Sequence, residues 1–319
     1  MRRAVFAAML LLFAAASHAR DYPLGIYVTE LYNFDYAGQT FCTDFWLWSV
    51  YGGAETDFRE TIDIVHDLGS SVRIYSSNSA GGERFWMQQK INAQIQCRWD
   101  MKRFPFDSAD LSILLEDFRD IGDIRFVPDT ANSGISPLID VDGWNVTGFS
   151  LSETAVDYGT NFGDMRRTEK EAVYSRVAAT VSLTRVRPWV TFFKMTSCVF
   201  ISLVLSLLPF FMKPETDSRL ALPSAALFAV VGNKYVVDSA VPSSAALTLL
   251  DSIHSLSLVC ILLVCAVIIR TDGMRATHDR SELRRSFVID RLAACAISLV
   301  YVAANTMLVL RAFGFGMTR

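Results

Sequence analysis

Hydrophobic and polar positions follow two different patterns along this chain, and the change from one to the other falls between Arg187 and Pro188. Before that point, short runs rich in Val, Ile, Tyr, Phe and Trp are separated by turn signals such as Asp142-Gly143. The runs GIYVTEL and VYSRVAATVSLTR come close to strict alternation, which is typical of a strand buried on one face. Residues 20–187 are therefore predicted to form an all-β, immunoglobulin-like sandwich.

After Pro188 the pattern becomes almost continuously apolar. Four stretches of 22 to 25 residues follow, and at 1.5 Å per residue each would make a helix of about 33–37 Å, long enough to cross a bilayer. Residues 188–319 are therefore predicted to form a transmembrane domain of four helices, so that the whole chain is a multi-domain membrane protein. The expected helices are 189–212, 220–241, 247–269 and 289–313.

The first 19 residues have the features of a signal peptide. Arg2 and Arg3 precede the apolar run AVFAAMLLLFAAA, and Ser17-His18-Ala19 has the small residues that signal peptidase requires. Cleavage after Ala19 would export the sandwich and place the linker between the third and fourth spans in the cytoplasm. That linker is strongly basic, in agreement with the positive-inside rule. Its arginines are Arg270, Arg275, Arg280, Arg284 and Arg285.

Composition agrees with this division and excludes several classes of protein. Hydrophobic residues make up 51% of the 319 residues, and the mean hydropathy is +0.29. Residues 20–187 carry 25 acidic and 16 basic side chains, whereas residues 188–319 carry 8 acidic and 12 basic ones. An acidic exported domain does not suit a nucleic-acid-binding protein. The sequence has no nucleophile elbow, phosphate-binding loop or HExxH motif, so we expect neither an enzyme nor a cofactor or metal site.

The second predicted span differs from the other three because it carries polar and ionisable residues. Asn233, Lys234 and Asp238 lie within it, and lipid would not tolerate them on an exposed face. Positions three or four apart form one stripe of small and aromatic residues. Such a stripe fits either a helix enclosed by others or ordinary packing in a bundle. The stripe comprises Ala221, Ala225, Phe228, Gly232, Tyr235 and Ser239.

One string in the sandwich carries a family resemblance. Phe104-Pro105-Phe106-Asp107 follows Cys97 and precedes the alternating run LSILLE. It resembles the signature loop of the pentameric ligand-gated ion channels, the Cys-loop receptor superfamily, whose members join a β-sandwich to four helices. Gly143-Trp144-Asn145-Val146 is similar to a late-sandwich motif of that family, and SRLALPSAALFAVVGNKYVVDSAVP resembles its pore helix as far as Pro242. DRLAACAISLVYVAANTMLVLRAFGFG is similar to the fourth helix of the bacterial members.

Departures from the animal members of the family point to a bacterial homologue. Leu111 stands where those members have the second cysteine of the loop, so the loop disulfide cannot form. The linker before the fourth span is short, and the tryptophan-x-proline motif of the ligand pocket is not recognisable. Cys42 and Cys97 could pair with each other in an oxidising periplasm, or remain free.

The resemblance implies a homopentamer whose second spans surround an ion pore. The stripe would then line the pore, with Phe228 as a hydrophobic girdle and Tyr235 as an outer constriction. Asp217, with Glu215 nearby, would place rings of carboxylates at the cytoplasmic mouth and favour permeant monovalent cations. The acidic exported domain would add to that preference.

The resemblance also implies residues for gating and for ligand binding. The loop Phe104–Asp107 would press on the loop Ser239–Ala246, with Arg185 or Arg187 pairing with an acid across the interface between sandwich and helices. The alternative is that it forms only a buried turn. The ligand would be a small-molecule agonist held by aromatic side chains. Alternatively, protons would gate the channel, and His254 is an ionisable group at membrane depth. Gating candidates are Phe104, Pro105, Phe106, Asp107, Arg185, Arg187 and Pro242; ligand-binding candidates are Phe126, Tyr158, Phe162 and Tyr174.

Taken together, these features predict a ligand- or proton-gated, cation-selective channel of a bacterial inner membrane, surrounded by lipid and with its sandwich in the periplasm. The alternative is a non-conducting periplasmic ligand sensor with the same fold, anchored by a sealed helical bundle. Ala221, Ala225 and Phe228 favour the sensor, whereas Asp217 and the polar residues of the second span favour the channel.

Overall fold

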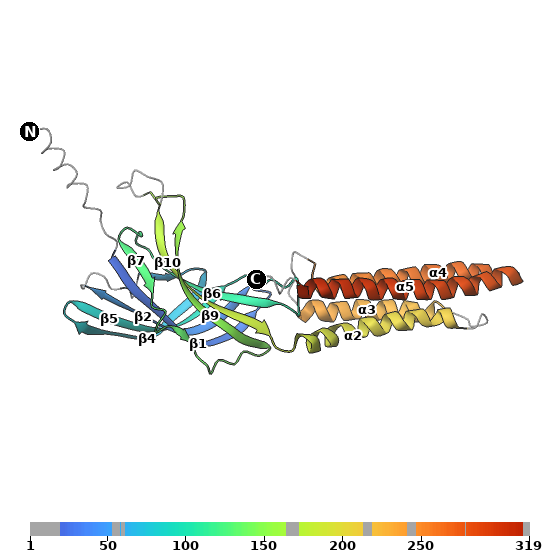
Figure 1. Cartoon of the computed structure of the whole chain (residues 1–319), viewed down its shortest axis with the longest axis horizontal. Helices are drawn as coiled ribbons and strands as arrows, with labels where there is room; N and C mark the ends of the chain where they lie inside the picture. The colour runs from blue at the N-terminus through green and yellow to red at the C-terminus, as the bar shows by residue number, and fades with distance from the viewer. Residues whose placement is uncertain are drawn as a thin grey trace, which may run out of the picture. The chain divides into compact units, whose positions relative to one another are not determined.

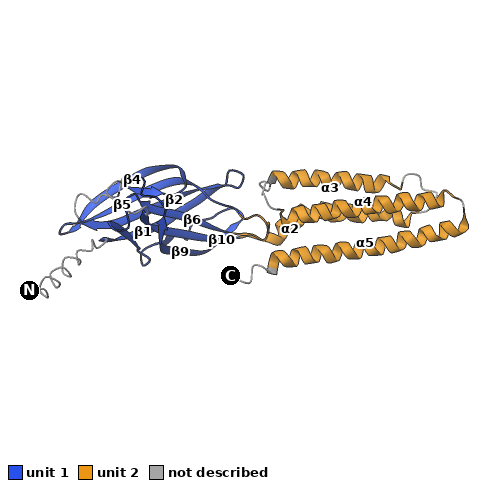
Figure 2. Cartoon of the chain, turned by 90° about the horizontal axis from the view of Figure 1, so that it is seen from above, with its two compact units in different colours: residues 1–99, 109–184 blue, residues 100–108, 185–319 orange. Residues whose placement is uncertain are grey.

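The computed structural model describes residues 20–52, 58, 61–163, 172–212, 219–240, 247–277 and 279–314. The predicted signal peptide, residues 1–19, lies outside this set. The chain divides into two compact units (Figure 2). The first consists of Met1–Trp99 and Ala109–Thr184, and the second of Asp100–Ser108 and Arg185–Arg319.

The first unit is built from two sheets, as the alternating pattern predicts (Figure 1). The larger sheet has the order β4-β5-β2-β1-β7, with β8 also paired to β1, and the smaller has the order β3-β6-β10-β9. The described residues of this unit contain strands and no helix, so the prediction of an all-β domain is confirmed for them. The strands are β1 (Arg20–Asp35), β2 (Thr40–Gly52), β3 (Ile62–Ile64), β4 (Asp67–Gly81), β5 (Arg84–Gln96), β6 (Ser108–Asp117), β7 (Ile124–Pro128), β8 (Gly134–Ile135), β9 (Trp144–Asp157) and β10 (Val173–Arg185).

The core of this sandwich-like unit comes from residues that alternate along the strands. In β10, alternate residues from Val177 to Leu183 are buried, because successive side chains of a strand point to opposite faces. In β1 the same applies to Leu24, Ile26 and Val28, which are completely buried. The alternation read from GIYVTEL and VYSRVAATVSLTR therefore corresponds to strands with one face in the core.

The second unit contains four long helices in its described residues. α2 (Pro188–Leu207) continues into the short 3₁₀ helix η2 (Leu208–Phe211). It is followed by α3 (Ala221–Ala240), α4 (Leu249–Arg275) and α5 (Arg280–Gly314). Pro188 occupies the first turn of α2, where its missing N–H costs no hydrogen bond. A capping box between Thr248 and Asp251 begins α4.

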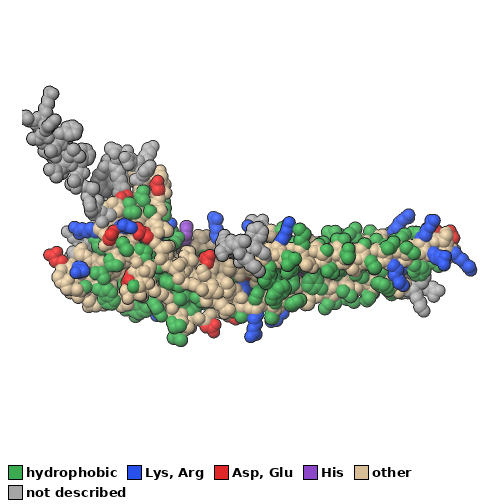
Figure 3. All heavy atoms as spheres, in the orientation of Figure 1, with side chains coloured by type: hydrophobic (Ala, Val, Ile, Leu, Met, Phe, Trp, Pro, Cys, Tyr) green, Lys and Arg blue, Asp and Glu red, His purple; other side chains and the backbone are tan. Residues whose placement is uncertain are grey.

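Three of these helices are long and apolar enough to cross a membrane, which agrees with the prediction of a membrane protein. They are Pro188–Phe211, Leu249–Arg275 and Arg280–Phe313. Large apolar side chains such as Ile201, Leu262 and Leu299 are exposed along them, and hydrophobic atoms cover much of the visible helical surface (Figure 3). α3 is not among the three, because its polar residues lower its hydropathy.

The last two helices extend beyond the predicted apolar spans. α4 continues to Arg275 rather than stopping at residue 269, and α5 begins at Arg280, nine residues before the predicted 289. The expected linker 270–288 is therefore largely helical. Arg, Glu and Leu in this region favour a helix, but their charges interrupt the apolar pattern from which a span is recognised.

Candidate functional site

The six residues of the predicted stripe all lie on exposed positions of α3. Phe228 is 76% exposed and Tyr235 is 74% exposed, although both are large aromatic side chains. The opposite face of the helix carries Ala226, Val230 and Val237, which are buried. In a single chain, α3 therefore packs through one face and leaves a second face free. The exposed stripe is Ala221, Ala225, Phe228, Gly232, Tyr235 and Ser239.

The polar residue Asn233 is turned toward the other helices. Its Nδ2 donates to the carbonyl oxygen of Met195 on α2 at 2.8 Å and lies 2.9 Å from Nε2 of His254 on α4. His254 is completely buried, and its Nδ1 lies 2.7 Å from the carbonyl oxygen of Leu250. Because a carbonyl can only accept, Nδ1 carries the proton and Nε2 accepts from Asn233. Asn233 thus joins α2, α3 and α4, and His254 is a hydrogen-bonded interior residue.

A second polar contact joins α3 to the start of α4. Nζ of Lys234 forms ion pairs with Asp238 one turn later and with Asp251 on α4, the latter at 2.7 Å. Asp251 also completes the capping box of α4 by accepting from Thr248. Two of the three polar residues noted in the second span, Asn233 and Lys234, therefore bind neighbouring helices.

The loop carrying the family-like string belongs to the helical unit, not to the sandwich from which it emerges in sequence. Nε of Arg185 donates to Oδ1 of Asp107 at 2.8 Å, and its guanidinium lies 4.7 Å from the centre of the Phe104 ring. Phe104 and Pro105 are buried, and the peptide bond between them is cis. Arg185 therefore pairs with Asp107, and both residues belong to the helical unit.

Phe106 connects the same loop to the first and the last helix of the unit. Its ring centre lies 4.8 Å from that of Trp189 and 5.0 Å from that of Phe313, near the start of α2 and the end of α5. The N–H of Leu249, at the start of α4, donates to the carbonyl oxygen of Lys102 at 3.0 Å. The loop thus contacts three helices at one end of the unit.

Not all predicted gating and selectivity residues join this arrangement. Arg187 is exposed and precedes α2 in a left-handed backbone conformation. Pro242, Glu215 and Asp217 lie outside the described residues.

Sequence reasoning missed a charge network formed by Arg219, Asp272, Arg275 and Asp290, in which Arg219 and Asp290 are buried and the Asp272 side chain is 42% exposed. Arg219 is 3% exposed and donates to Asp272 on α4 and, at 2.6 Å, to Asp290 on α5. Arg275 donates to the same Asp290 oxygen at 2.6 Å. Arg219 also donates to the carbonyl oxygen of Pro209 at 3.1 Å, so the residues just before α3 are tied to η2, α4 and α5. An aspartate within an apolar span, as at Asp290, is the signal that would have indicated this network.

Three of the four predicted ligand-binding aromatics lie together. The ring centres of Tyr158, Phe162 and Tyr174 are 5.5–6.1 Å apart in all three pairs. Tyr158 and Phe162 are 44% and 65% exposed. The fourth residue, Phe126, is completely buried and packs against Phe58, so it belongs to the core.

An ion pair lies beside this aromatic cluster. Arg176 and Glu116 form a salt bridge of 2.6 Å, and the Tyr158 hydroxyl donates to Glu116 at 3.0 Å. Burial, followed by the hydrogen bond to Glu116, raises the pKa of Tyr158 above its ordinary value. The cluster of Tyr158, Phe162 and Tyr174 can present ring faces to a ligand, and Arg176 neutralises the carboxylate at its edge.

Cysteines and metal ligands add no chemistry to these sites. All six cysteines are described, and all six, including Cys42 and Cys97, are free. Within the described part of the chain, no group of three or more His, Cys, Asp or Glu side chains could hold a metal ion.

No protein-family model matches this chain, and no curated protein matches it.

Proposed function

We propose that the protein is a pentameric ligand- or proton-gated ion channel whose pore is lined by α3. The observation that carries this proposal is the exposed stripe of α3, which coincides with the six positions expected from the resemblance to Cys-loop receptors. α3 is also the one long described helix that is not apolar enough to be a membrane span by composition. A polar helix with a free face is suited to a water-filled pathway shared by several copies of the chain.

Phe228 and Tyr235 supply the two constrictions of such a pore. Both side chains are about three-quarters exposed in the single chain, so nothing within the subunit prevents them from facing an axis. A ring of phenylalanines can stop ions by excluding water from a narrow passage. Phe228 is therefore the proposed gate and Tyr235 the outer constriction.

Cation selectivity is supported by the charges near the inner end of α3. Glu215 and Asp217 lie shortly before that helix in sequence, and Arg219 follows them. Arg219 is buried against Asp272 and Asp290, so its positive charge is neutralised inside the subunit. Rings of carboxylates from Glu215 and Asp217 would then act without opposition from the Arg219 charge.

Gating requires that a bound ligand change the packing of the helical unit. The 100–108 loop contacts the start of α2, the start of α4 and the end of α5, which makes it the proposed coupling element. Two packings of this loop that differ by a few kcal/mol would let a ligand shift the open population. The cluster of Tyr158, Phe162 and Tyr174 is the proposed place for a cationic agonist.

A non-conducting sensor of the same fold remains the second candidate. It is favoured by the apolar character of Ala221, Ala225 and Phe228, which offer no oxygen atoms to an ion. Both candidates place the chain in a bacterial inner membrane with the sandwich in the periplasm.

Current measurements on the purified protein in voltage-clamped membranes distinguish the two. The wild type is exposed to a drop to about pH 4 and then to a panel of small amines, alongside Asp217→Ala and Phe228→Ala. We expect a cation current that loses selectivity in the first variant and leaks without ligand in the second. The matched controls are Asp279→Ala, an exposed acid between α4 and α5, and Leu299→Ala, an exposed apolar residue of α5. Silence of all proteins, with pentamers verified by mass measurement, would contradict the channel and leave the sensor.

A further inference from the structure

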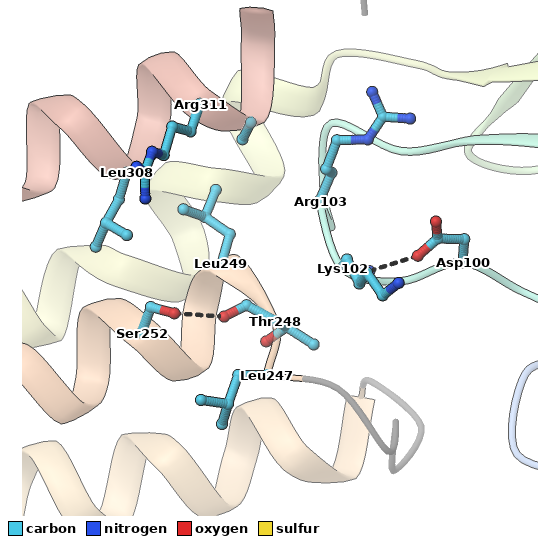
Figure 4. Close-up of a pocket in the computed structure, with 10 residues that line it drawn as sticks. Asp100, Lys102, Arg103, Leu247, Thr248, Leu249, Ser252, Leu308 and Arg311 are labelled. Carbon is cyan, nitrogen blue, oxygen red and sulfur yellow. Dashed lines mark hydrogen bonds between the residues drawn. The ribbon is translucent and has the colours of Figure 1, made fainter. Parts of the chain in front are cut away.

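Two cavities, one in each unit, differ in the charges on their walls. In the helical unit, a cavity of about 450 Å³ is lined by three basic residues and one acid (Figure 4). In the sandwich, a cavity of about 550 Å³ is lined by one arginine, Arg98, and one aspartate, Asp110. This second volume is in the range of sites that hold small molecules. Its other lining residues are Gln39, His66, Gln96, Cys97, Ser112 and Leu114.

Backbone hydrogen bonds hold the segments that form the wall of the sandwich cavity. The N–H of Cys97 donates to the carbonyl oxygen of Gln39 at 2.8 Å, and the N–H of Val65 donates to that of Leu114 at 2.9 Å. Gln39 and His66 have left-handed backbones, with φ of 57° and 65°. Side chains other than glycine are uncommon in this conformation, and such residues gather at functional sites. The wall is therefore formed before any ligand binds.

The two opposite charges of this cavity do not neutralise each other. Arg98 and Asp110 are both exposed, and among the residues that the structure describes neither takes part in an ion pair, in contrast to Arg176. The Ser182 hydroxyl donates to Oδ1 of Asp110 at 2.8 Å and orients the carboxylate. Burial raises the pKa of the Cys97 thiol to about 12, so the thiol adds no charge at neutral pH. A ligand that carries both a carboxylate and an ammonium group would satisfy the two charges at once.

The uncharged polar groups of the wall suit the middle of such a ligand. Gln39 and Gln96 each carry an amide, which both donates and accepts hydrogen bonds as a peptide group does. Nε2 of Gln39 donates to the carbonyl oxygen of Tyr36 at 3.3 Å, so its Oε1 can accept the N–H of a ligand. Leu114 is half-buried and offers an apolar contact to a side chain. The wall thus combines the groups that recognise the two ends, the amide and a side chain of a peptide.

We propose that this cavity binds a short zwitterionic peptide, such as a dipeptide, with its carboxylate on Arg98 and its ammonium group on Asp110. A single amino acid has no peptide group for the glutamines and leaves most of the volume unfilled. None of Tyr158, Phe162 and Tyr174 lines the cavity, so the site is separate from the proposed agonist site. It does not depend on ion conduction.

Protection of Cys97 from thiol modification tests this site without a measurement of current. The full chain in detergent is treated with methyl methanethiosulfonate at about pH 7, where an α-amino group is charged, and mass spectrometry follows the Cys97 peptide. We expect alanyl-alanine to slow the modification of Cys97 but not of Cys42, which lies in the same unit and does not line the cavity. Acetylation or amidation of the dipeptide removes one of its charges. Either change should raise the concentration needed for half-protection by about fivefold.

Charge variants identify the partner of each end of the dipeptide. In Arg98→Gln the amidated and the free dipeptide should protect equally, and in Asp110→Asn the acetylated and the free dipeptide should do so. The controls Arg84→Gln and Asp142→Asn remove exposed charges of the sandwich outside the cavity and should behave as wild type. Absence of protection in the wild type, equal protection of Cys42, or the same loss in all four variants would overturn the proposal. Protection by free alanine at the same concentration as alanyl-alanine would overturn the assignment to a peptide.

Discussion

Arg185 and Asp107, which are 78 positions apart in sequence, form a hydrogen-bonded ion pair of 2.8 Å in the helical unit. The side chain of Asp107 is 3% exposed and that of Arg185 is 12% exposed, so water screens the pair only weakly. The pair fixes the loop that carries Phe104 and Phe106 against the chain just before α2.

Removal of one partner of this pair should destabilise the protein. Asp107→Ala leaves the Arg185 charge buried without its carboxylate, and we expect a loss of about 3–5 kcal/mol in the free energy of unfolding. The measurement is denaturant unfolding in detergent, followed by circular dichroism. Arg187→Ala removes a nearby exposed arginine and serves as the control, with an expected change below about 1 kcal/mol. Similar effects of both substitutions would show that the pair has no special role.

Asp290 should be equally important at the other end of the helices. It is completely buried and accepts from both Arg219 and Arg275, so Asp290→Asn leaves two arginines with one carboxylate between them. We expect a loss of about 3–5 kcal/mol in the same unfolding measurement. Glu282→Gln breaks an exposed pair with Arg285 on the same helix and should cost less than about 1 kcal/mol. An Asp290→Asn protein as stable as wild type would contradict the network.

The contact between Asn233 and His254 leads to a double-variant prediction. Asn233→Leu should cost about 1–3 kcal/mol, because the Met195 carbonyl and His254 Nε2 lose their donor in a buried position. Replacing His254 by Leu as well should recover part of that loss, since both polar partners are then absent. Ser239→Ala, on the exposed face of α3, is the neutral control. If the loss in unfolding free energy of the double variant equals the sum of the losses in the two single variants, the two residues act separately.

Cys97 should react slowly with alkylating reagents while the protein is folded. Burial raises its pKa from 9.0 to about 12, so at pH 8 its thiolate is about a thousandfold rarer than in the unfolded chain. The raised pKa also makes the free energy of unfolding depend on pH. The contribution of the protonated thiol is fully present below about pH 9 and is lost as the pH rises toward 12. Iodoacetamide labelling, read by mass spectrometry of the Cys97 peptide, should accelerate on unfolding in urea. Equal labelling rates with and without urea would be incompatible with a raised pKa of this half-buried thiol.

Several parts of the fold could be predicted because burial on one face leaves a pattern in the sequence. The strand over Val173–Arg185 coincides with the alternating run VYSRVAATVSLTR. The exposed face of α3 follows from positions three and four apart, since a helix turns every 3.6 residues. The resemblance implied that Arg185 or Arg187 would pair with an acid across the interface between sandwich and helices, and it named neither Asp107 as the partner nor the helical unit as the place of the pair.

Other features depend on packing that no local pattern records. The rotation of each helix decides which arginines near the α4–α5 connection turn inward. The side chain of Arg275 is only 7% exposed, whereas Arg270 and Arg284 are exposed. Phe126 could not be separated from Tyr158, Phe162 and Tyr174 by residue type. Its place near the middle of β7 buries it, whereas Tyr158 and Phe162 follow the end of β9.

Because residues 100–108 pack with the helices while the strands on both sides of them belong to the sandwich, the helical unit is discontinuous in sequence. A single cut near residue 187 would strip the helices of Phe104 and Phe106 and would leave both aromatic rings without their partners on the other fragment. The two units are therefore not interchangeable modules. A chimaera that replaces the sandwich must therefore keep residues 100–108 together with the helices. Joining two proteins at Arg187 alone would leave the helical unit without this loop.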